Sequence, residues 1–394
     1  MKTKLYSFRL VRFLLAIAIC LPVWGSNAFA QTAESYVVLD NAAGTLTFKH
    51  DENKPAGAFS LNEGETYPAW YDGDGTDYNK NNIQKVIFDP SFANARPTSC
   101  CAWFFACKDL TTIEGIENLK TENVKSMNFM FYNCPSLASL DLSTLDTRNV
   151  TNMNAMFGWC NNLTSLDISN FNTHNVANME SMFFFCSNLT SLDISNFNTQ
   201  NVTSMVAMFH TCSTLTSLDV SKFNTQNVTN MDCMFINCEK LASLDVSNFN
   251  TEKVVSMSGM FWDCNGLTSL DVSNFNTENV TDMRYMFEDC GNLATIYASD
   301  KFVTTACLED IGMFFDCKKL VGAVPYDPNM VGKEMANYTT GYFTYKAASG
   351  IDAVSTTDNI AAEYYDVNGR RLNAPQKGIN IVKRGNITTK VLVK

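Results

Sequence analysis

The stretch Ser165–Thr173 reads SLDISNFNT, and the same nine residues return at Ser191–Thr199. Near-copies begin at Ser217, Ser243 and Ser269, so that each copy starts 26 residues after the one before it. A fixed period between about 20 and 50 residues is typical of a solenoid, in which no unit can bury its apolar face alone. The stretch therefore predicts a fold made by stacking one small unit many times.

Cysteine follows the same period over a longer part of the chain. Seven cysteines are each 26 residues from the next: Cys134, Cys160, Cys186, Cys212, Cys238, Cys264 and Cys290. Cys107 and Cys317 flank this series at a spacing of 27 residues. A Met-Phe pair ends three residues before each of the seven. The repeats therefore extend well beyond the copies of the opening phrase.

The middle of one unit has the apolar spacing of a helix. Steps of three and four place its apolar residues on one helical face: Val150, Met153, Met156, Phe157 and Cys160. Thr151 stands where its hydroxyl can cap this helix. The period then falls to two, because Leu166 and Ile168 alternate with polar residues as on a half-buried strand. Asn170 begins the turn that follows.

Stacked strand–turn–helix units predict a curved rod. Strands lie about 4.8 Å apart, whereas packed helices lie about 8–10 Å apart, so the strands are expected on the concave side. The expected fold class is an α/β repeat solenoid, a leucine-rich-repeat-like right-handed coil of 26-residue strand–turn–helix units. A small β-rich cap is expected before it and a small β domain after it.

The consensus MxxMFxxCxxLTSLDxSNFNTxNVT resembles the BspA-type leucine-rich repeat of bacterial surface proteins, over residues from about Cys100 to Tyr345. The match is partial, because Phe171 stands where the common leucine-rich motif has Asn or Cys. Members of that family are exported surface proteins, and some are adhesins. The resemblance therefore implies partners among extracellular proteins of a host or of neighbouring microbes, but it identifies no contact residues.

The ends of the chain indicate export. Residues 1–30 have a basic start, an apolar run and the sequence Ala28-Phe29-Ala30, which is typical of a secretory signal peptide. No other apolar run is long enough to cross a bilayer. The protein is therefore expected at the cell surface or outer membrane, or outside the cell. Beyond the signal peptide we expect a cap at 31–99, the solenoid at 100–346, a linker at 347–360 and a β domain at 361–394.

Two short patterns support the two β-rich regions. Tyr36–Asp40 and Thr45–Phe48 flank a Gly-containing turn, which predicts a hairpin in the cap. The last segment, with Gly369 and Gly378, resembles the C-terminal sorting domain of the type IX secretion system. Asn380 departs from that pattern, since many such domains have Tyr there. A working sorting signal and a β-tail without that role are both compatible with the sequence.

The charge distribution argues against nucleic acid as a partner. Residues 31–360 contain 18 basic and 38 acidic residues, a formal charge of −20. A body this acidic repels phosphates of nucleic acids and anionic lipids. Residues 361–394 contain seven basic and two acidic residues, so only this tail could favour an anionic surface.

The 14 cysteines of the chain are not expected to form a disulfide ladder. Equivalent positions on neighbouring helices lie about 8–10 Å apart, beyond the Cα separation of about 4.4–6.8 Å that a disulfide tolerates. The periodic cysteines are therefore expected to be buried thiols of low reactivity. One disulfide among Cys100, Cys101 and Cys107 remains an alternative.

No catalytic or metal-binding pattern is present in the sequence. The chain has three histidines, and only His210 lies near a cysteine of the series, Cys212, whose equivalents have no such neighbour. There is no HExxH, GxSxG, CxxC or phosphate-binding glycine loop. We therefore expect no enzyme activity, no cofactor and no metal site.

The candidate binding residues lie on the polar side of the expected strands. One file consists of Asp141, Asp167, Asp193, Asp219, Asp245 and Asp271. A second file contains Ser165, Ser191, Ser217 and Ser243. Carboxylates about 5 Å apart would raise one another's pKa. Such a row could bind a basic protein segment or calcium, or each Asp could only accept hydrogen bonds from nearby serines and turn amides.

The sequence thus favours an exported binding or adhesion module with contacts spread over many units. A passive surface or envelope protein is one alternative. A calcium- or glycan-binding repeat module is the other.

Overall fold

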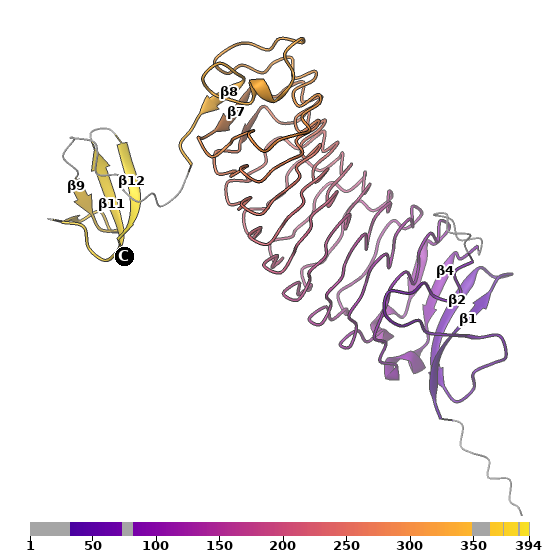
Figure 1. The fold of residues 1–394 in the computed structure, drawn as a ribbon. Helices are drawn as coiled ribbons and strands as arrows, with labels where there is room; N and C mark the ends of the chain where they lie inside the picture. Colours follow the sequence, from indigo (N-terminus) through magenta and orange to yellow (C-terminus); the bar gives the residue numbers. More distant parts are fainter. Residues whose placement is uncertain (1–31, 73–81, 349–362, 373, 385–386, 394) are drawn as a thin grey trace, which may run out of the picture.

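The computed structural model describes residues 32–72, 82–348, 363–372, 374–384 and 387–393. It contains an amino-terminal sheet, a stack of repeated coils and a carboxy-terminal sheet (Figure 1). The expected signal peptide at 1–30 and most of the expected linker at 347–360 lie outside the described residues.

The amino-terminal sheet confirms the expected hairpin. Strands β1 (Glu34–Asp40) and β2 (Thr45–Asp51) pair antiparallel, and β3 (Phe59–Ser60) pairs with the outer edge of β1. Strand β2 then pairs parallel with β4 (Lys85–Phe88), which pairs parallel with β5 (Thr112–Glu114). The order β3-β1-β2-β4-β5 therefore leads directly from the hairpin into the coils.

A cluster of rings and two short 3-10 helices close this end of the core. Phe48 stacks on Phe88 and Trp103, with ring centroids 4.7 and 4.9 Å away. Helices η1 (Pro90–Asn94) and η2 (Ile116–Asn118) cover the junction with the coils. The cap is therefore continuous with the apolar interior of the stack.

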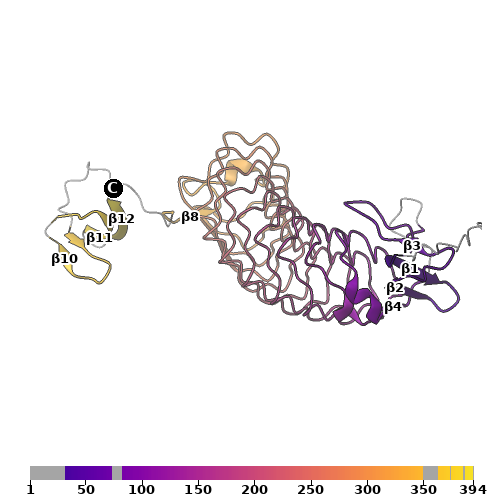
Figure 2. The same ribbon diagram turned by 90° about the horizontal axis from the view of Figure 1, so that it is seen from below.

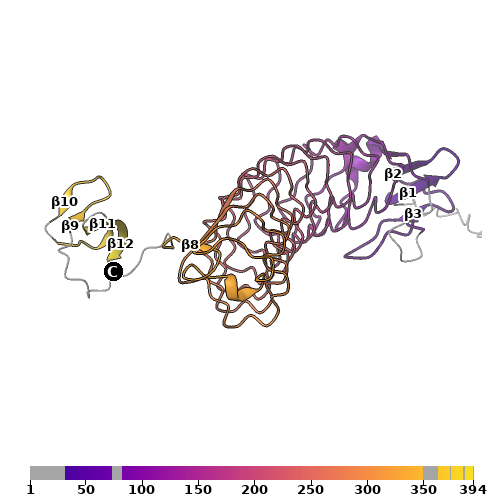
Figure 3. The same ribbon diagram turned by 90° about the horizontal axis from the view of Figure 1, so that it is seen from above.

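The repeats form coils that stack in the order of the sequence, as Figures 1, 2 and 3 show from three directions. Isolated parallel bridges join successive coils: Ser99↔Ser126, Ser126↔Asn152, Asn152↔Asn178, Asn178↔Ser204, Ser204↔Asn230, Asn230↔Ser256, Ser256↔Asp282 and Asp282↔Glu309. Each bridge begins what we call a Met-Phe segment, which runs from the bridge residue to the periodic cysteine, for example residues 152–160.

The expected strand–turn–helix unit is wrong. The described residues contain short 3-10 helices but no α-helix, so the α/β solenoid is not the fold of this chain. The Met-Phe segment, expected to be a helix, is a series of tight turns. Met156 N–H bonds Met153 O at 3.3 Å, whereas Ala155 N–H bonds Glu180 O of the next coil at 2.8 Å. Without helices, the difference in spacing that predicted a concave strand side is absent.

Left-handed residues explain why the turns do not continue as a helix. Two positions of each Met-Phe segment, four residues apart, have φ of about +50° to +65°, outside the right-handed region that a helix requires. The first position holds Ala102, Phe129, Ala155, Ser181, Ala207, Cys233, Gly259, Tyr285 and Gly312. The second holds Ala106, Asn133, Trp159, Phe185, Thr211, Asn237, Asp263, Asp289 and Asp316. The amides are thereby turned toward the next coil.

The expected strands are also mostly absent. Of the copies of SLDxS, only the one at β6 (Ser269–Asp271) forms a strand, and it pairs parallel with β7 (Thr295–Ala298). Strand β7 pairs with β8 (Phe343–Tyr345), and η3 (Lys333–Met335) lies between them in sequence. The carboxy-terminal end of the stack therefore carries a three-stranded parallel sheet.

The apolar residues of the Met-Phe segments are buried although the helix is absent. Val150, Met153, Met156 and Phe157 are all fully buried. Successive Phe rings stack with centroids 5.5 to 5.9 Å apart, from Phe131 to Phe314. This column of rings is the axis of the core.

The periodic cysteines are free, buried thiols, as expected. Each donates a weak hydrogen bond to a Phe carbonyl of the preceding coil; Cys160 Sγ lies 3.1 Å from Phe131 O. Burial raises the pKa of Cys160 to about 12. The thiols of Cys100, Cys101 and Cys107 are not joined in a disulfide, so this alternative is not formed.

The carboxy-terminal region forms a separate four-stranded antiparallel sheet in the order β10-β9-β11-β12. Its strands are β9 (Glu363–Tyr365), β10 (Arg371–Leu372), β11 (Gly378–Arg384) and β12 (Ile387–Val393). Asn380 is buried, and its amide nitrogen donates to Gln376 O at 2.6 Å. Asn380 therefore supports the turn before β11, and the sorting role of this sheet stays a prediction.

Replacing Phe183 by Ala should lower the free energy of unfolding by about 3–5 kcal/mol, the usual cost of removing a buried ring. The ring lies between those of Phe157 and Phe209, at 5.8 and 5.7 Å, so its loss opens the core column. Urea unfolding measures the change. Val255→Ala, at a side chain that is 47% exposed, is the control and should change the value by less than about 0.5 kcal/mol.

Replacing Gly259 by Ala should destabilise the protein by about 1 kcal/mol or more, because its φ of +59° strains an L-residue. The added Cβ would also lie 3.1 Å from Ile236 Cδ1. Gly291→Ala, where φ is not left-handed, is the control. Equal melting temperatures for the two variants would contradict the proposed role of the left-handed position.

Candidate functional site

The Asp file lies on an exposed turn that has the same geometry in every copy. Asp167 Oδ1 accepts a hydrogen bond from Ser169 N–H at 3.0 Å, and Asp193 does the same with Ser195 at 2.9 Å. The equivalent bonds occur at Asp141, Asp219, Asp245 and Asp271. One carboxylate oxygen is thus held by the turn, and five of the six Asp residues are exposed.

At Asp141, Asp167, Asp193 and Asp219 the turn lowers the pKa of the carboxylate. The Ser169 backbone N–H is the main cause of the lowered pKa of Asp167, and the neighbouring Asp141 and Asp193 raise it only weakly. Ser143 N–H and Ser195 N–H lower the pKa values of Asp141 and Asp193 in the same way. At Asp219 the Ser221 hydroxyl is the main cause of the lowered pKa, and the Ser221 N–H is the next. Neighbouring carboxylates thus raise the pKa of Asp167 as expected, but the close N–H outweighs this screened repulsion and the net pKa is lowered.

Asp271 differs from the rest of the file. Its carboxylate is partly buried and forms an ion pair with Lys346, which follows strand β8. Burial raises its pKa, but the hydrogen bonds from Lys346 and Ser273 are together stronger, so the net pKa is lowered. The exposed part of the file therefore ends before this copy.

The Ser file lies beside the carboxylates. Ser165, Ser191, Ser217 and Ser243 are all exposed. Their hydroxyl groups make no hydrogen bond to another described residue. The structure thus places the predicted Ser and Asp residues on one surface, but the serines that fix the carboxylates are those two positions after each Asp.

A third file, of asparagine, was not predicted as a site. Its members are Asn172, Asn198, Asn224, Asn250 and Asn276, and the Oδ1 of each accepts the N–H two residues later. The side-chain NH2 of Asn250 and of Asn276 makes no hydrogen bond to a described residue. The Asn-Thr pair that recurs in the repeats was a signal for this turn, because Asn favours such local hydrogen bonds.

The neighbouring Thr residues are structural. Thr173 is buried, its hydroxyl donates to Asn198 O at 3.0 Å, and it accepts from Asn198 N–H at 2.7 Å. The same pair of bonds recurs at Thr147 and Thr199. These bonds fix the Asn file from one coil to the next.

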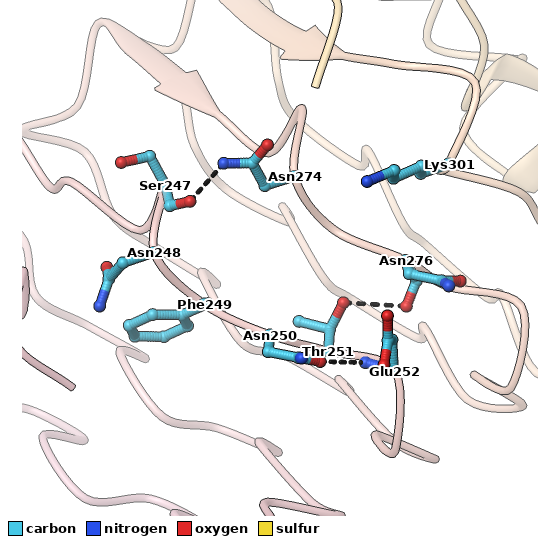
Figure 4. A pocket seen from close by; sticks show the side chains of 9 residues that line it. All are labelled: Ser247, Asn248, Phe249, Asn250, Thr251, Glu252, Asn274, Asn276 and Lys301. Carbon is cyan, nitrogen blue, oxygen red and sulfur yellow. Dashed lines mark hydrogen bonds between the residues drawn. The ribbon is translucent and has the colours of Figure 1, made fainter. Parts of the chain in front are cut away.

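A polar pocket of about 350 Å³ opens where the regular copies end (Figure 4). It is lined by Ser247, Asn248, Phe249, Asn250, Thr251, Glu252, Asn274, Asn276 and Lys301. Figure 4 shows the Lys301 side chain extending toward the open centre of the pocket. Lys301 lies in the last unit, whose cysteine spacing is 27 residues instead of 26. The pocket therefore combines amide donors, one cation and one carboxylate, Glu252.

The structure brings no nucleophile and base together at His210. Burial lowers the pKa of His210 to about 4. Its Nδ1 lies 2.9 Å from Thr211 Oγ1, while the Cys212 thiol donates to Phe183 O at 3.2 Å. The pKa of this thiol is raised by burial, so both groups are held in their neutral forms.

Within the described residues, no cluster of three or more His, Cys, Asp or Glu side chains is placed to hold a metal ion. The described part of the chain also contains no helix with the length and apolar character needed to span a membrane.

Two overlapping parts of the chain, residues 98–218 and 207–324, match one family model, described as "Mycoplasma protein of unknown function, DUF285". Together they cover more than half of the chain. The chain belongs to the DUF285 family. No curated protein matches it. The matched residues are those of the coil stack, so the DUF285 repeat is this 26-residue coil. The finding is consistent with a BspA-type repeat, and the leucine-rich repeat and the type IX tail stay predictions.

Acidification should destabilise the DUF285 stack below about pH 4. The turns lower the pKa of Asp167, Asp193 and Asp219 from the usual 3.8, so their stabilisation is present above that value and is lost as the pH falls through the folded-state pKa. In the variant with Asp167, Asp193 and Asp219 changed to Asn, the free energy of unfolding should decrease less steeply between about pH 4 and pH 2. Urea unfolding at a series of pH values measures this.

Glu117→Gln is the control for that series, because its exposed carboxylate makes no hydrogen bond to a described residue. If the free energy of unfolding decreased equally with pH in the wild type and in the variant at Asp167, Asp193 and Asp219, the turn amides would not stabilise the carboxylates.

Proposed function

We propose that this DUF285 protein is an exported surface protein that binds extracellular proteins of a host or of neighbouring microbes. The observation that carries the proposal is the file of five exposed carboxylates, each fixed by the same Ser turn. Because the groups repeat at a fixed interval, a long partner can engage several of them at once, and weak contacts then add up.

Charge supports a partner with basic segments. Residues 31–360 carry 18 basic and 38 acidic residues, and five carboxylates of the file are on exposed residues. The file is solvent-exposed, so each contact with a Lys or Arg is worth little alone and is weakened by salt. The proposed interaction is therefore broad, multivalent and salt-dependent. An enzyme is not proposed, because the best candidate pair, His210 and Cys212, is neutral and separately hydrogen-bonded.

Glycan binding is a second candidate, favoured by the pocket of Figure 4. The free amide groups of Asn250 and Asn276 can donate to sugar hydroxyls, and Lys301 can pair with a sugar carboxylate. Phe249 adds an apolar wall, but it is buried and offers little ring surface for stacking. The pocket is therefore suited to one polar residue of a glycan rather than to an apolar ligand.

The chain from residue 31 onward should bind immobilised fibronectin, fibrinogen or intact partner bacteria saturably at physiological salt. Changing Asp193, Asp219 and Asp245 to Asn should weaken this binding about tenfold or more, equal to about 1.4 kcal/mol. Surface plasmon resonance and whole-cell binding measure it.

The matched control changes Asp109→Asn, Glu117→Gln and Glu239→Gln, which removes the same charge from exposed positions outside the file. Equal losses of binding affinity in both variants would indicate that binding depends only on the net charge of the protein. Binding lost in Lys301→Gln but kept in the Asp variant would favour the glycan candidate. Absence of binding to every surface would favour a passive envelope protein.

A further inference from the structure

After the bridge residue, alternate amides of each Met-Phe segment point along the stack in one direction. N–H groups of Ala155, Phe157 and Trp159 donate to the next coil, at 2.8, 3.0 and 2.6 Å. The carbonyls that accept from the previous coil belong to the residues between them, such as Met156, which accepts from Phe131 N–H at 2.9 Å. An ordinary strand edge alternates donors and acceptors. Over these alternate positions one end of the stack presents carbonyls and the other end presents N–H groups, whereas residues just before a segment, such as Thr151, donate to the previous coil.

The carbonyl end is closed by side chains of the amino-terminal cap. Asn62 Nδ2 donates to Cys101 O at 2.9 Å. Trp70 Nε1 donates to Trp103 O, also at 2.9 Å. Because Trp70 and Trp103 are buried, this end offers little to a partner.

The N–H end is only half closed. In the last Met-Phe segment, Phe314 N–H donates to Val331 O at 3.0 Å and Asp316 N–H donates to Tyr326 Oη at 3.1 Å. The N–H groups of Asp310 and Gly312 occupy the two equivalent outward positions and make no hydrogen bond to any described residue. Both residues are partly exposed, so an acceptor can approach them.

Exposed apolar side chains lie in the same segment. Leu308 is 78% exposed, Ile311 61% and Phe315 48%. Large apolar residues exposed together beside open backbone donors are typical of an edge that pairs with another chain. We call Leu308, Ile311 and Phe315, with the N–H groups of Asp310 and Gly312, the carboxy-terminal edge.

Neither a second copy of the chain nor a free anion suits this edge. Two carboxy-terminal edges would bring donors against donors, and at the other end of a second copy Cys101 O and Trp103 O have partners in the cap and belong to buried residues. Glu309 and Asp310 carry carboxylates in the same segment, which repel anions, and Asp310 Oδ2 accepts a hydrogen bond from Lys333 N–H at 2.9 Å. A neutral carbonyl is the remaining acceptor, and the same carboxylates favour Lys or Arg near it.

We propose that the carboxy-terminal edge docks an extended peptide segment of another protein. Its backbone carbonyls accept hydrogen bonds from Asp310 and Gly312 N–H, its apolar side chains cover Leu308 and Ile311, and a basic side chain pairs with Glu309. This is recognition by strand addition, in which main-chain bonds give affinity and side chains give selectivity. The edge uses no residue of the Asp file, so the inference goes beyond the proposed function.

The test is selection of a random peptide library displayed on phage against the chain from residue 31 onward. Enriched peptides should combine apolar and basic residues and lack acidic ones. Their synthetic forms should bind the wild type and lose about tenfold or more in affinity, about 1.4 kcal/mol, with Leu308→Gln plus Ile311→Gln. The triple Asp193, Asp219, Asp245 to Asn variant should bind them normally, which separates this edge from the Asp file.

Val255→Gln is the matched control, because Val255 is an apolar side chain with 47% exposure outside the edge. Hydrogen exchange read by mass spectrometry should slow on peptide binding in the fragment that contains residues 308–316. Unchanged urea midpoints of the variants show that they fold. The proposal is overturned if no peptide is enriched, if the double variant binds as well as the wild type, or if protection appears elsewhere.

Discussion

The structure depends on one constraint: the backbone N–H groups of each coil must donate hydrogen bonds to carbonyls of the next coil. Four N–H groups of a Met-Phe segment find their carbonyls in the following coil, and the two left-handed residues make this orientation possible. A buried amide without a partner costs about 1–3 kcal/mol. A coil that buried these N–H groups without a following coil would therefore be unstable. Repetition supplies the partner for every coil except the last.

The common direction of these amides gives the stack an electrical polarity like that of a helix. Aligned peptide dipoles favour negative charge near the end that presents N–H groups. The Met-Phe segments at 99–107, 126–134 and 152–160 contain no acidic residue. The last two contain six: Asp282, Glu288, Asp289, Glu309, Asp310 and Asp316. The acidic residues thus gather at the electropositive end, which also makes that end unsuited to a free anion.

Much of the packing could be predicted from spacing alone. The apolar steps of three and four identified the buried residues Met153, Met156 and Phe157, and the cysteine period identified a column of buried thiols. The same spacing gave the wrong element, because successive tight turns and a helix both return apolar side chains to one side. Gly259 and Gly312 were the available signal, since glycine recurs where φ is positive. Ala155 and Ser181 occupy equivalent positions with positive φ, so glycine does not mark this position in every unit.

The candidate site shows the same division. The Asp file could be located from sequence, but the sign of its pKa shift depended on an N–H only 3.0 Å from Asp167 Oδ1, which spacing cannot show. The Asn file and the pocket at Lys301 were missed because they require knowing which residues of neighbouring coils face one another. By itself the sequence determined the repeat, its period and its buried positions, because these follow from the order of apolar and polar residues. Tertiary structure alone decided the backbone conformation, because the competing hydrogen-bond partners lie one coil away.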